Sequence, residues 1–248
     1  MRGPSAYETI GCGYTGRRTP DPRIAGRIMS ALGDAASVLN VGAGAGSYEP
    51  ADRKVVAVEP SDVMLAQRPA GAAPAVRAVA ESLPFSDDRF DVAMALLTVH
   101  HWSDVERGLA ELRRVARRQV VFGFDPARQL DLWFTAEYVP ASAAMEQGRA
   151  PSTDELSEWL GGATVEAVPI PHDCSDGFLG AYWRRPEAYL DPDVRASISS
   201  IAQLDPSDVE PGIERLAGDL ESGAWHERHG ALLEVDELDL GYWLLVAG

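Results

Sequence analysis

The sequence predicts an α/β fold, a doubly wound and mostly parallel seven-stranded sheet with a helical insertion between the last two strands. Short apolar runs alternate with stretches of helical periodicity, the order expected when helices cover both faces of one sheet. The run Phe90–Leu97 is almost wholly apolar, as a central parallel strand should be. A glycine-rich loop follows the first strand, where α/β sheets bind their ligands.

The expected strands are apolar runs bounded by turn residues. They are Ser37–Val41, Val55–Val58, Ala75–Val79, Phe90–Leu97, Val120–Phe124, Val165–Ile170 and Leu240–Val246. The first helix is expected to have Asp21 as its cap, Pro22 in its first turn and Gly33 at its end. Ser61 is placed to cap another helix, whereas Pro50 predicts that a helix after the glycine loop forms poorly.

We expect a single domain over residues 1–248, with an N-terminal arm at 1–22 and a substrate-covering insertion at 171–237. The span between the last two strands is too long for a hairpin and contains two helical stretches. Its aromatic side chains are interpreted as part core and part pocket lining; they include Phe178, Tyr182, Trp183, Tyr189 and Trp225.

The composition describes a chain that can bury a core and that repels polyanions. Of its 248 residues, 46% are hydrophobic, which excludes the disordered class. The formal net charge is −16, a sign that repels phosphate backbones, and Lys54 is the single lysine. We therefore expect a small-molecule substrate, no nucleic-acid or membrane partner, and a monomer or homodimer.

The two cysteines, Cys12 and Cys174, form neither a metal-binding spacing nor a disulfide framework. Both are expected to be reduced thiols. The first residues lack the apolar segment of a signal peptide, and no apolar run approaches the length of a membrane span. We expect a cytoplasmic protein.

The glycine loop has glycines at 42, 44 and 46, and Glu59 lies at the end of the second strand. A glycine turn followed by an acid at the next strand tip is how α/β sheets hold nucleotide-like ligands. A plain tight turn would also use glycines. The dinucleotide fingerprint of NAD(P)-dependent oxidoreductases requires a glycine where Ser47 stands, so the spacing fits S-adenosylmethionine better.

Several motifs occur in the order typical of one family. They are Val38-Leu-Asn-Val-Gly-Ala-Gly-Ala-Gly46, Val58-Glu-Pro-Ser61 with Met64, Ala80-Glu-Ser-Leu-Pro-Phe85, Phe90-Asp91 and His100-His101-Trp102. With these motifs the chain resembles a class I S-adenosylmethionine-dependent methyltransferase, of the broad group with the ubiquinone/menaquinone-type and trans-aconitate-type enzymes. The resemblance covers residues 5–125 and extends to the final strand.

The resemblance implies S-adenosylmethionine as the cofactor. The glycines would line its methionine part, Glu59 would accept the ribose hydroxyls, and Met64 would pack on the adenine face. The backbone of Ala80 would meet the adenine edge, the backbone near Leu97 would lie by the sulfonium, and Arg18 would face the carboxylate. The full expected set is Tyr14, Arg18, Asn40, Gly42, Gly44, Gly46, Glu59, Met64, Ala80, Glu81 and Leu97.

Two positions depart from the family pattern. Asn40 stands where the family usually has aspartate, which removes a negative charge near the cofactor's ammonium group or a loop amide. Val79 stands where an aspartate often holds the adenine amino group, a contact that Glu81 or the backbone would have to replace. Both changes predict weaker cofactor binding rather than a different fold.

His100 and His101 are the candidate catalytic residues, because they follow the fourth strand at the ligand-binding edge of the sheet. Histidine titrates near neutral pH, so one of them can take a proton from the acceptor. Neighbouring residues on an extended segment point in opposite directions, and the sequence does not say which one faces the substrate. A packing role beside Trp102 is the alternative.

The remaining polar clusters favour structural roles. His172 and Asp173 are interpreted as a turn in preference to a second proton-handling pair. His226 and His229 share a helical spacing but lack a third ligand, so no metal is expected. The helix that Ser103 and Asp104 open is expected to have a basic C-terminal turn, which complements the helix dipole and is interpreted as structural in preference to nucleic-acid binding. Its arginines are Arg113, Arg114, Arg117 and Arg118.

The sequence therefore predicts methyl transfer to a small molecule, which the aromatic insertion and acidic surface suggest is apolar or aromatic. The alternative is a methyltransferase-fold protein that binds the cofactor for a structural role or for non-methylating chemistry such as a cyclisation. The acceptor itself and the methylated atom are not encoded in any motif.

Overall fold

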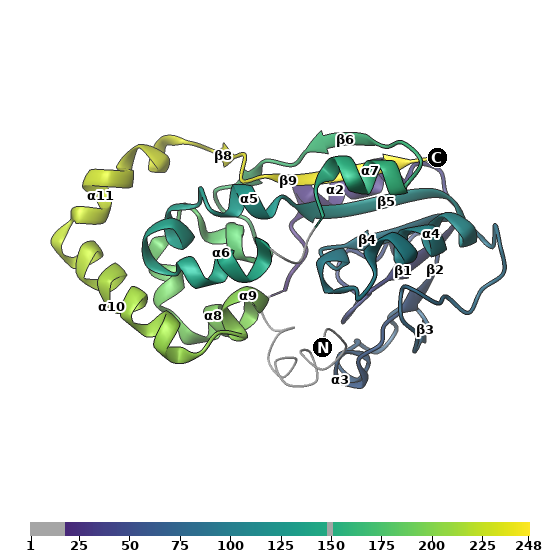
Figure 1. The fold of residues 1–248 in the computed structure, drawn as a ribbon, viewed down its shortest axis with the longest axis horizontal. Helices are drawn as coiled ribbons and strands as arrows, with labels where there is room; N and C mark the ends of the chain where they lie inside the picture. The colour runs from purple at the N-terminus through teal and green to yellow at the C-terminus, as the bar shows by residue number, and fades with distance from the viewer. Residues whose placement is uncertain (1–17, 148–150) are drawn as a thin grey trace.

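The computed structural model describes residues 18–147 and 151–248 (Figure 1). The strands are β1 Ser37–Val41, β2 Lys54–Val58, β3 Ala75–Val76, β4 Phe90–Leu96, β5 Ala116–Phe124, β6 Thr164–Ala167, β7 Ile170–Pro171, β8 Glu237–Leu238 and β9 Tyr242–Ala247. The α-helices are α2 Pro22–Leu32, α3 Asp62–Ala66, α4 Val105–Val115, α5 Pro126–Gln129, α6 Pro140–Gln147, α7 Thr153–Trp159, α8 Pro192–Ser197, α9 Ser199–Ala202, α10 Pro206–Ser222 and α11 Ala224–His229. Shorter helical turns are η2 Val99–His101, η3 Phe134–Tyr138, η4 Leu179–Tyr182, η5 Pro186–Leu190 and η6 Gly230–Glu234.

Seven strands form one sheet in the order β3-β2-β1-β4-β5-β9-β6. The first five are parallel, whereas β9 runs antiparallel to both of its neighbours, β5 and β6. This is the doubly wound, mostly parallel seven-stranded sheet that the sequence predicts.

Helices cover both faces of the sheet, which explains why β4 is apolar throughout. Val92 and Met94 of β4 belong to the core beneath α2. Ala93 and Ala95, which alternate with them, pack in the core beneath α4 and α7. The period-2 geometry of a strand therefore supplies each helical layer with alternate residues.

The helix ends follow the predicted caps. The Asp21 side chain accepts from the amide of Arg23 at the start of α2, and Gly33 ends that helix with a φ of 58°. The Ser61 side chain accepts from the amide of Met64 in α3. Between β1 and β2 the chain forms turns and bends throughout the described residues 42–53, as Pro50 predicts.

Several strand predictions are wrong at their ends. The strand expected at Val120–Phe124 begins at Ala116, so Arg117 and Arg118 lie in β5 and not in the last turn of α4, and the strand expected from Leu240 begins at Tyr242. The expected strand Val165–Ile170 divides into β6 and β7, because Pro169 has no amide to donate and the ladder with β9 stops at Val168. The segment β7 then pairs with β8 in a separate two-stranded sheet. The expected strand Ala75–Val79 ends at Val76, the residue that pairs with Val58 at the end of β2.

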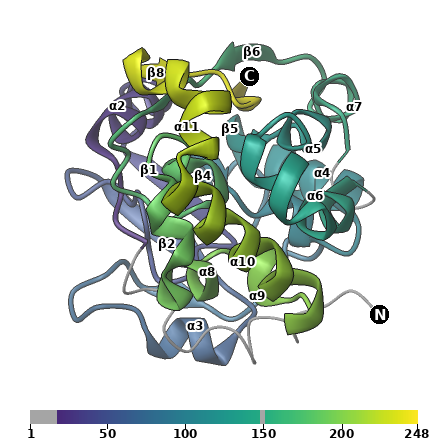
Figure 2. The same cartoon turned by 90° about the vertical axis from the view of Figure 1, so that its left-hand side faces the viewer.

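The residues between β7 and β8 form a helical group beside the sheet. Helices α8 to α11 lie together at one end of the molecule in Figure 1, next to α6. In Figure 2 this end faces the viewer, and α10 and α11 cross in front of the strands. The insertion expected between the last two strands of the sheet is therefore built mainly from helices, including the 17-residue α10.

Candidate active site

The loop at residues 42–46 follows β1, and its three glycines all adopt left-handed backbone angles, with φ of 71°, 52° and 99°. The amides of Gly42 and Ala43 donate to the carbonyl oxygen of Val58 over 2.9 and 3.0 Å. A Cβ on Gly42 would lie 2.1 Å from Oγ1 of Thr98. Glycine is required here for both its φ and its close approach to the tip of β4.

Glu59 lies directly after β2 and is 6% exposed. Its Oε2 accepts from the amide of Gly44 over 2.8 Å, and its Oε1 accepts from the amide of Ser61 over 2.9 Å. The structure therefore brings the second-strand acid and the glycine loop together, at the place where the ribose acceptor is expected.

Arg68 holds the other side of the same glycine. Its guanidinium donates to the carbonyl oxygen of Gly44 over 3.2 Å and to that of Ala73 over 3.0 Å. It also pairs with the carboxylate of Glu49 at 2.8 Å, and both side chains are almost completely buried. The backbone of Gly44 is thus fixed on both sides, through its N–H by Glu59 and through its C=O by Arg68.

Asn40 is connected to this ion pair. Its Nδ2 donates to Oε1 of Glu49 over 3.1 Å, and the residue is 2% exposed. The carboxylate that the family usually places at position 40 is absent, and a different carboxylate, that of Glu49, lies within hydrogen-bond distance instead. No sequence motif pointed to Glu49 or Arg68.

Of the residues expected around the adenine, Met64 packs on the glycine loop and Glu81 contacts the start of α4. Met64 is buried, and its Cε lies 3.2 Å from where a Cβ on Gly44 would be, so Met64 packs on the loop. Ala80 is buried, whereas Val79 is 40% exposed. The carboxylate of Glu81 accepts from the amide and hydroxyl of Ser103, each over 2.7 Å, and so supports the start of α4.

Leu97 follows β4 with a φ of 51°, a left-handed conformation that is rare for a branched side chain. Its amide donates to the carbonyl oxygen of Phe122 in β5 over 2.7 Å. Such a conformation costs about 1–3 kcal/mol and is common where a strand tip forms part of a site. Leu97, the position expected nearest to the sulfonium, therefore has a strained backbone conformation.

The two candidate histidines lie in η2 and differ in their surroundings. His100 is 8% exposed, lines a cavity and has its ring 5.0 Å from that of Phe124. His101 is partly exposed and does not line that cavity; its ring centroid lies 3.8 Å from that of His100, with the two rings tilted by 50°. The structure therefore favours His100 over His101, a choice that the sequence left open.

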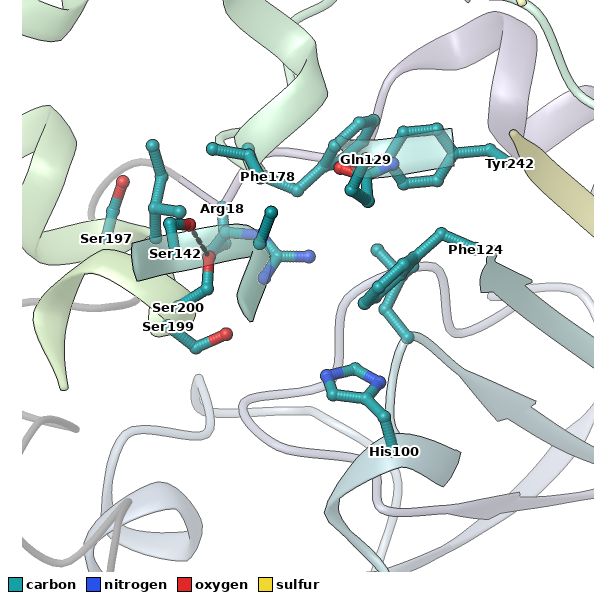
Figure 3. A pocket seen from close by; sticks show the side chains of 14 residues that line it. Arg18, His100, Phe124, Gln129, Ser142, Phe178, Ser197, Ser199, Ser200 and Tyr242 are labelled. Atoms are coloured by element: carbon teal, nitrogen blue, oxygen red, sulfur yellow. Dashed lines mark hydrogen bonds between the residues drawn. The ribbon is translucent and has the colours of Figure 1, made fainter. Parts of the chain in front are cut away.

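The cavity beside His100 lies between the strand tips and the insertion and comprises about 520 Å³ of empty space, part of which is open to solvent (Figure 3). Leu97, His100 and Phe124 close it on the sheet side. The remaining described lining residues come from the arm, α5, α6, the insertion and β9; they are Arg18, Gln129, Ser142, Ala143, Phe178, Leu179, Ser197, Ile198, Ser199, Ser200 and Tyr242. Burial raises the pKa of Tyr242 well above its usual value, so its phenol stays protonated at neutral pH.

Asp176 connects three segments that surround this region. Nε and Nη2 of Arg18 donate to its two oxygens over 2.6 and 3.3 Å. The hydroxyl of Tyr48, just after the glycine loop, donates to Asp176 over 2.9 Å and accepts from the amide of Asp21. Burial raises the pKa of Tyr48, which keeps this phenol a donor. Tyr14, the other expected arm residue, lies outside the described residues.

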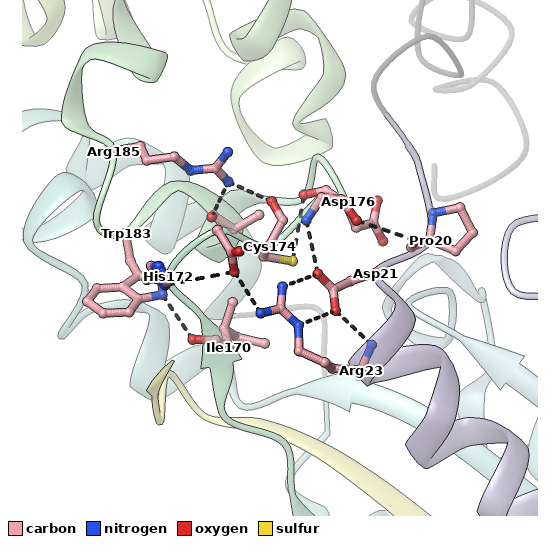
Figure 4. A network of polar contacts seen from close by, with 12 residues as sticks. Pro20, Asp21, Arg23, Ile170, His172, Cys174, Asp176, Trp183 and Arg185 are labelled. Atoms are coloured by element: carbon pink, nitrogen blue, oxygen red, sulfur yellow. Dashed lines mark hydrogen bonds and ion pairs between the residues drawn. The ribbon is translucent and has the colours of Figure 1, made fainter. Parts of the chain in front are cut away.

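A second polar network joins the start of α2 to the insertion (Figure 4). Asp21 accepts from the side chain of Arg23 and from the amide of Ser175. Arg23 also pairs with Asp173 at 2.7 Å, whereas His172 lies 3.8 Å from Asp173. Asp173 is therefore engaged mainly by Arg23, consistent with the structural interpretation of that turn.

The other histidine and arginine clusters singled out in the sequence do not line the cavity. His229 lies 2.8 Å from Glu137, and within residues 18–147 and 151–248 no group of three or more acidic, His or Cys side chains is placed to hold a metal. Arg114 bonds to Glu111 and to the carbonyl oxygens of Leu83 and Phe85, a structural role. No helix of this described part is long and apolar enough to cross a bilayer.

Comparisons with known proteins bear on the identity of this site. A family model described as a methyltransferase domain matches residues 39–124. A crystal structure described as a methyltransferase from an antibiotic biosynthesis pathway of Anabaena variabilis is 33% identical, with a TM-score of 0.87, and covers 94% of this chain and 99% of that one.

Two further relatives are more distant. The uncharacterized methyltransferase YcgJ of Bacillus subtilis is 32% identical over 92 residues, and its crystal structure gives a TM-score of 0.51 at 18% identity over 90% of this chain and 95% of that one. The [4+2]-cyclase SpnF shares the fold alone, with 17% identity and a TM-score of 0.51 over 91% of this chain and 82% of its own. The matched segments span 18% and 36% of the curated relatives.

Proposed function

The chain belongs to the family of class I S-adenosylmethionine-dependent methyltransferases, and from this premise we propose that it methylates a small molecule of apolar or aromatic character. The observation that carries the acceptor class is the cavity of about 520 Å³ beside His100, with Leu97 and Phe124 at its sheet end. Such a concave, largely apolar space with few polar groups is typical of small-molecule sites.

The residues of the glycine loop fit the family's cofactor. The loop approaches the strand tips so closely that a Cβ on Gly42 would overlap Thr98, and the carboxylate of Glu59 stands beside it. We propose that the loop holds the methionine part, that Glu59 accepts the ribose hydroxyls and that Met64 packs on the adenine. When bound, the cofactor would supply a methyl group activated on a sulfonium. The new bond to that methyl carbon uses a lone pair of the acceptor, and the electron pair of the broken carbon–sulfur bond remains on sulfur.

The protein's contribution is then alignment, exclusion of water and removal of one proton. The insertion and α6 close the cavity over the strand tips, which restricts the acceptor's orientation. We propose that His100 takes the proton that a hydroxyl acceptor loses, because His100 lines the cavity and Tyr242 is held protonated.

The organisation of the whole protein remains part of the proposal. We propose one domain over residues 1–248, in which the arm at 1–22 and the insertion at 171–237 cover the cofactor and the acceptor. The arm is supported by the contact of Arg18 with Asp176 of the insertion. We further propose a cytoplasmic monomer or homodimer without nucleic-acid or membrane partners.

Calorimetry with S-adenosylmethionine and S-adenosylhomocysteine tests cofactor binding directly. Incubation with S-adenosylmethionine and a panel of phenols, carboxylates and amines should then yield S-adenosylhomocysteine only when an acceptor is present. Absence of binding of both cofactor forms would contradict the proposal. Binding without turnover, together with conversion of an acceptor that gains no methyl group, would favour non-methylating chemistry like that named for SpnF.

A further inference from the structure

The acceptor cavity has an aromatic end at the edge of the sheet. The ring of Phe124 lies 5.0 Å from His100 and 5.9 Å from Tyr242, and the ring of Phe178 lies 4.8 Å from Tyr242. All four side chains line the cavity, and Figure 3 shows them on one side of it. These rings contact one another, and the faces and edges that they leave toward the cavity favour a flat unsaturated group packed beside them. The reactive part of the acceptor is therefore expected to be such a ring, beside His100.

The opposite end of the cavity is lined by serine hydroxyls. Oγ of Ser142 in α6 lies 3.0 Å from Oγ of Ser200 in α9, and both residues are buried. Two hydroxyls carry two protons, and the bond between them uses one. Within the described chain the second proton has no acceptor, so this pair can donate to a group in the cavity. Ser199 adds a third, partly exposed hydroxyl at the same end.

Gln129 presents a second buried polar atom to the cavity. Its Nε2 donates to the carbonyl oxygen of Leu240 over 3.0 Å, which fixes the orientation of the side-chain amide. No donor within the described residues reaches its Oε1, although Gln129 is only 2% exposed. Because Gln129 lines the cavity, its Oε1 can accept a hydrogen bond from a donor placed there.

The cavity wall is nearly neutral. Arg18 is the only charged side chain among its described lining residues, and the buried carboxylate of Asp176 neutralises it at 2.6 Å. A carboxylate or ammonium group on the acceptor would therefore lose its hydration without gaining a counter-ion in this wall. The net charge of −16 adds a further penalty for anions.

From these observations we infer that the acceptor is an uncharged molecule with two different ends. One end is a flat unsaturated ring that carries the methylated group, and the other carries a hydroxyl or amide that bonds to Ser142 or Ser200. This inference rests on the proposed function, because it assigns the cavity to the acceptor.

Four phenols of similar size test the inference: tyrosol, para-ethylphenol, para-hydroxyphenylacetate and tyramine. Their distal groups are a hydroxyl, a methyl, a carboxylate and an ammonium. Binding is measured by calorimetry with S-adenosylhomocysteine present. Tyrosol should bind about 5- to 10-fold more tightly than para-ethylphenol, the value of one hydrogen bond, and more than 10-fold more tightly than the two charged phenols.

Serine variants test whether Ser142 and Ser200 cause the preference for tyrosol over para-ethylphenol. Ser142→Ala/Ser200→Ala should reduce the advantage of tyrosol over para-ethylphenol to about onefold, while the exposed Ser222→Ala on α10 should keep it. If the double variant fails to fold, Ser200→Ala alone should still lower the ratio. Retention of the full ratio in folded Ser200→Ala and in the double variant would remove the serine pair from the acceptor site.

The two proposals fail in different ways. Binding of S-adenosylhomocysteine with no binding of any of the four phenols, or with tighter binding of a charged one, would overturn the acceptor class and leave the methyltransferase proposal standing. If the wild-type protein did not bind S-adenosylhomocysteine, the methyltransferase proposal itself would be overturned.

Discussion

The side-chain amide of Asn40 donates a hydrogen bond to Oε1 of Glu49 over 3.1 Å. The carboxylate of Glu49 is neutralised in turn by Arg68, which holds the carbonyl oxygen of Gly44. The loop is thus supported by an acid nine positions after the usual one. Asn40 is suited to this arrangement because it donates to Glu49, as an aspartate cannot.

Asn40→Asp should therefore lower the stability of the protein, although it introduces the residue that is usual in the family. Two buried carboxylates would face each other in place of a hydrogen bond, which should lower the free energy of unfolding by about 1–3 kcal/mol. Urea unfolding and S-adenosylhomocysteine calorimetry measure the change. Glu49→Gln added to Asn40→Asp should recover part of the loss. Tighter cofactor binding by the single variant would show that Glu49 does not replace the missing aspartate.

Glu59→Ala should raise the Kd of S-adenosylhomocysteine by roughly 10- to 150-fold, equivalent to about 1.5–3 kcal/mol for hydrogen bonds to a charged group. It removes the acceptor for the amides of Gly44 and Ser61 as well as the proposed ribose contact. Glu155→Ala is a matched control, because that carboxylate also accepts from a backbone amide, in the capping box of α7. An unchanged Kd for Glu59→Ala would show that the ribose acceptor is misassigned.

His100→Ala should lower kcat by roughly 10²- to 10⁴-fold, the range of general-base catalysis, with little change in cofactor affinity. His101→Ala should lower kcat less than about 5-fold, because His101 does not line the cavity. The comparison uses steady-state kinetics with a hydroxyl acceptor identified from the panel. Equal and small effects would indicate that the enzyme works by alignment alone.

Gly42→Ala should lower the free energy of unfolding by about 3 kcal/mol or more, since it combines a left-handed φ with an overlap on Thr98. Gly71→Ala is the control, because Gly71 has a φ of 92° and no atom within 4 Å of an added Cβ. That control should lose only about 1 kcal/mol, the cost of the φ itself. Thermal and urea unfolding measure both variants. If Gly42→Ala and Gly71→Ala lost similar amounts of stability, the close packing of the loop on β4 would be contradicted.

Asp21 should make stability depend on acid pH. Burial opposes its ionisation, but hydrogen bonds from the Arg23 side chain and the amide of Ser175 outweigh burial and lower the pKa from 3.8 to about 2. The lowered value means that the carboxylate stabilises the fold above about pH 4 and loses this contribution as the pH falls through about 2. Because Arg23 is half exposed, the expected contribution is about 1 kcal/mol after solvent screening.

Urea unfolding of wild type and Asp21→Asn at several pH values measures this contribution. Asparagine can still cap α2, so the difference between the two proteins should report mainly the carboxylate. That difference should shrink between about pH 4 and pH 2. A difference that stays constant over this range would show that the hydrogen bonds of Asp21 do not depend on its charge.

The sequence predicted the sheet because its signals are local. The apolar run of β4, the caps Asp21 and Ser61, and Glu59 beside the glycine loop each depend on neighbours within a few residues. Pro169 carried the signal that would have ended β6 correctly, since it cannot donate to the ladder.

The contacts that complete the site connect residues distant in sequence and carry no local pattern. Asp176 meets Arg18 and Tyr48 only after the insertion folds back on the arm. Nothing in the spacing of Arg68 and Glu49 marks them as a buried pair. The preference for His100 over His101 as the proposed base rests on the cavity that His100 lines, whereas the alternation of an extended segment gave no basis for choosing.

The position of β9 affects how the molecule can be synthesised. The ribosome completes this strand after all the others, yet β9 lies between β5 and β6 and pairs with both. Until β9 emerges, β5 has an open edge, and Phe122 and Val121 lack the partners that later cover them. Unpaired edges of this kind favour association between chains. The nascent protein is therefore most exposed to aggregation just before its final strand arrives.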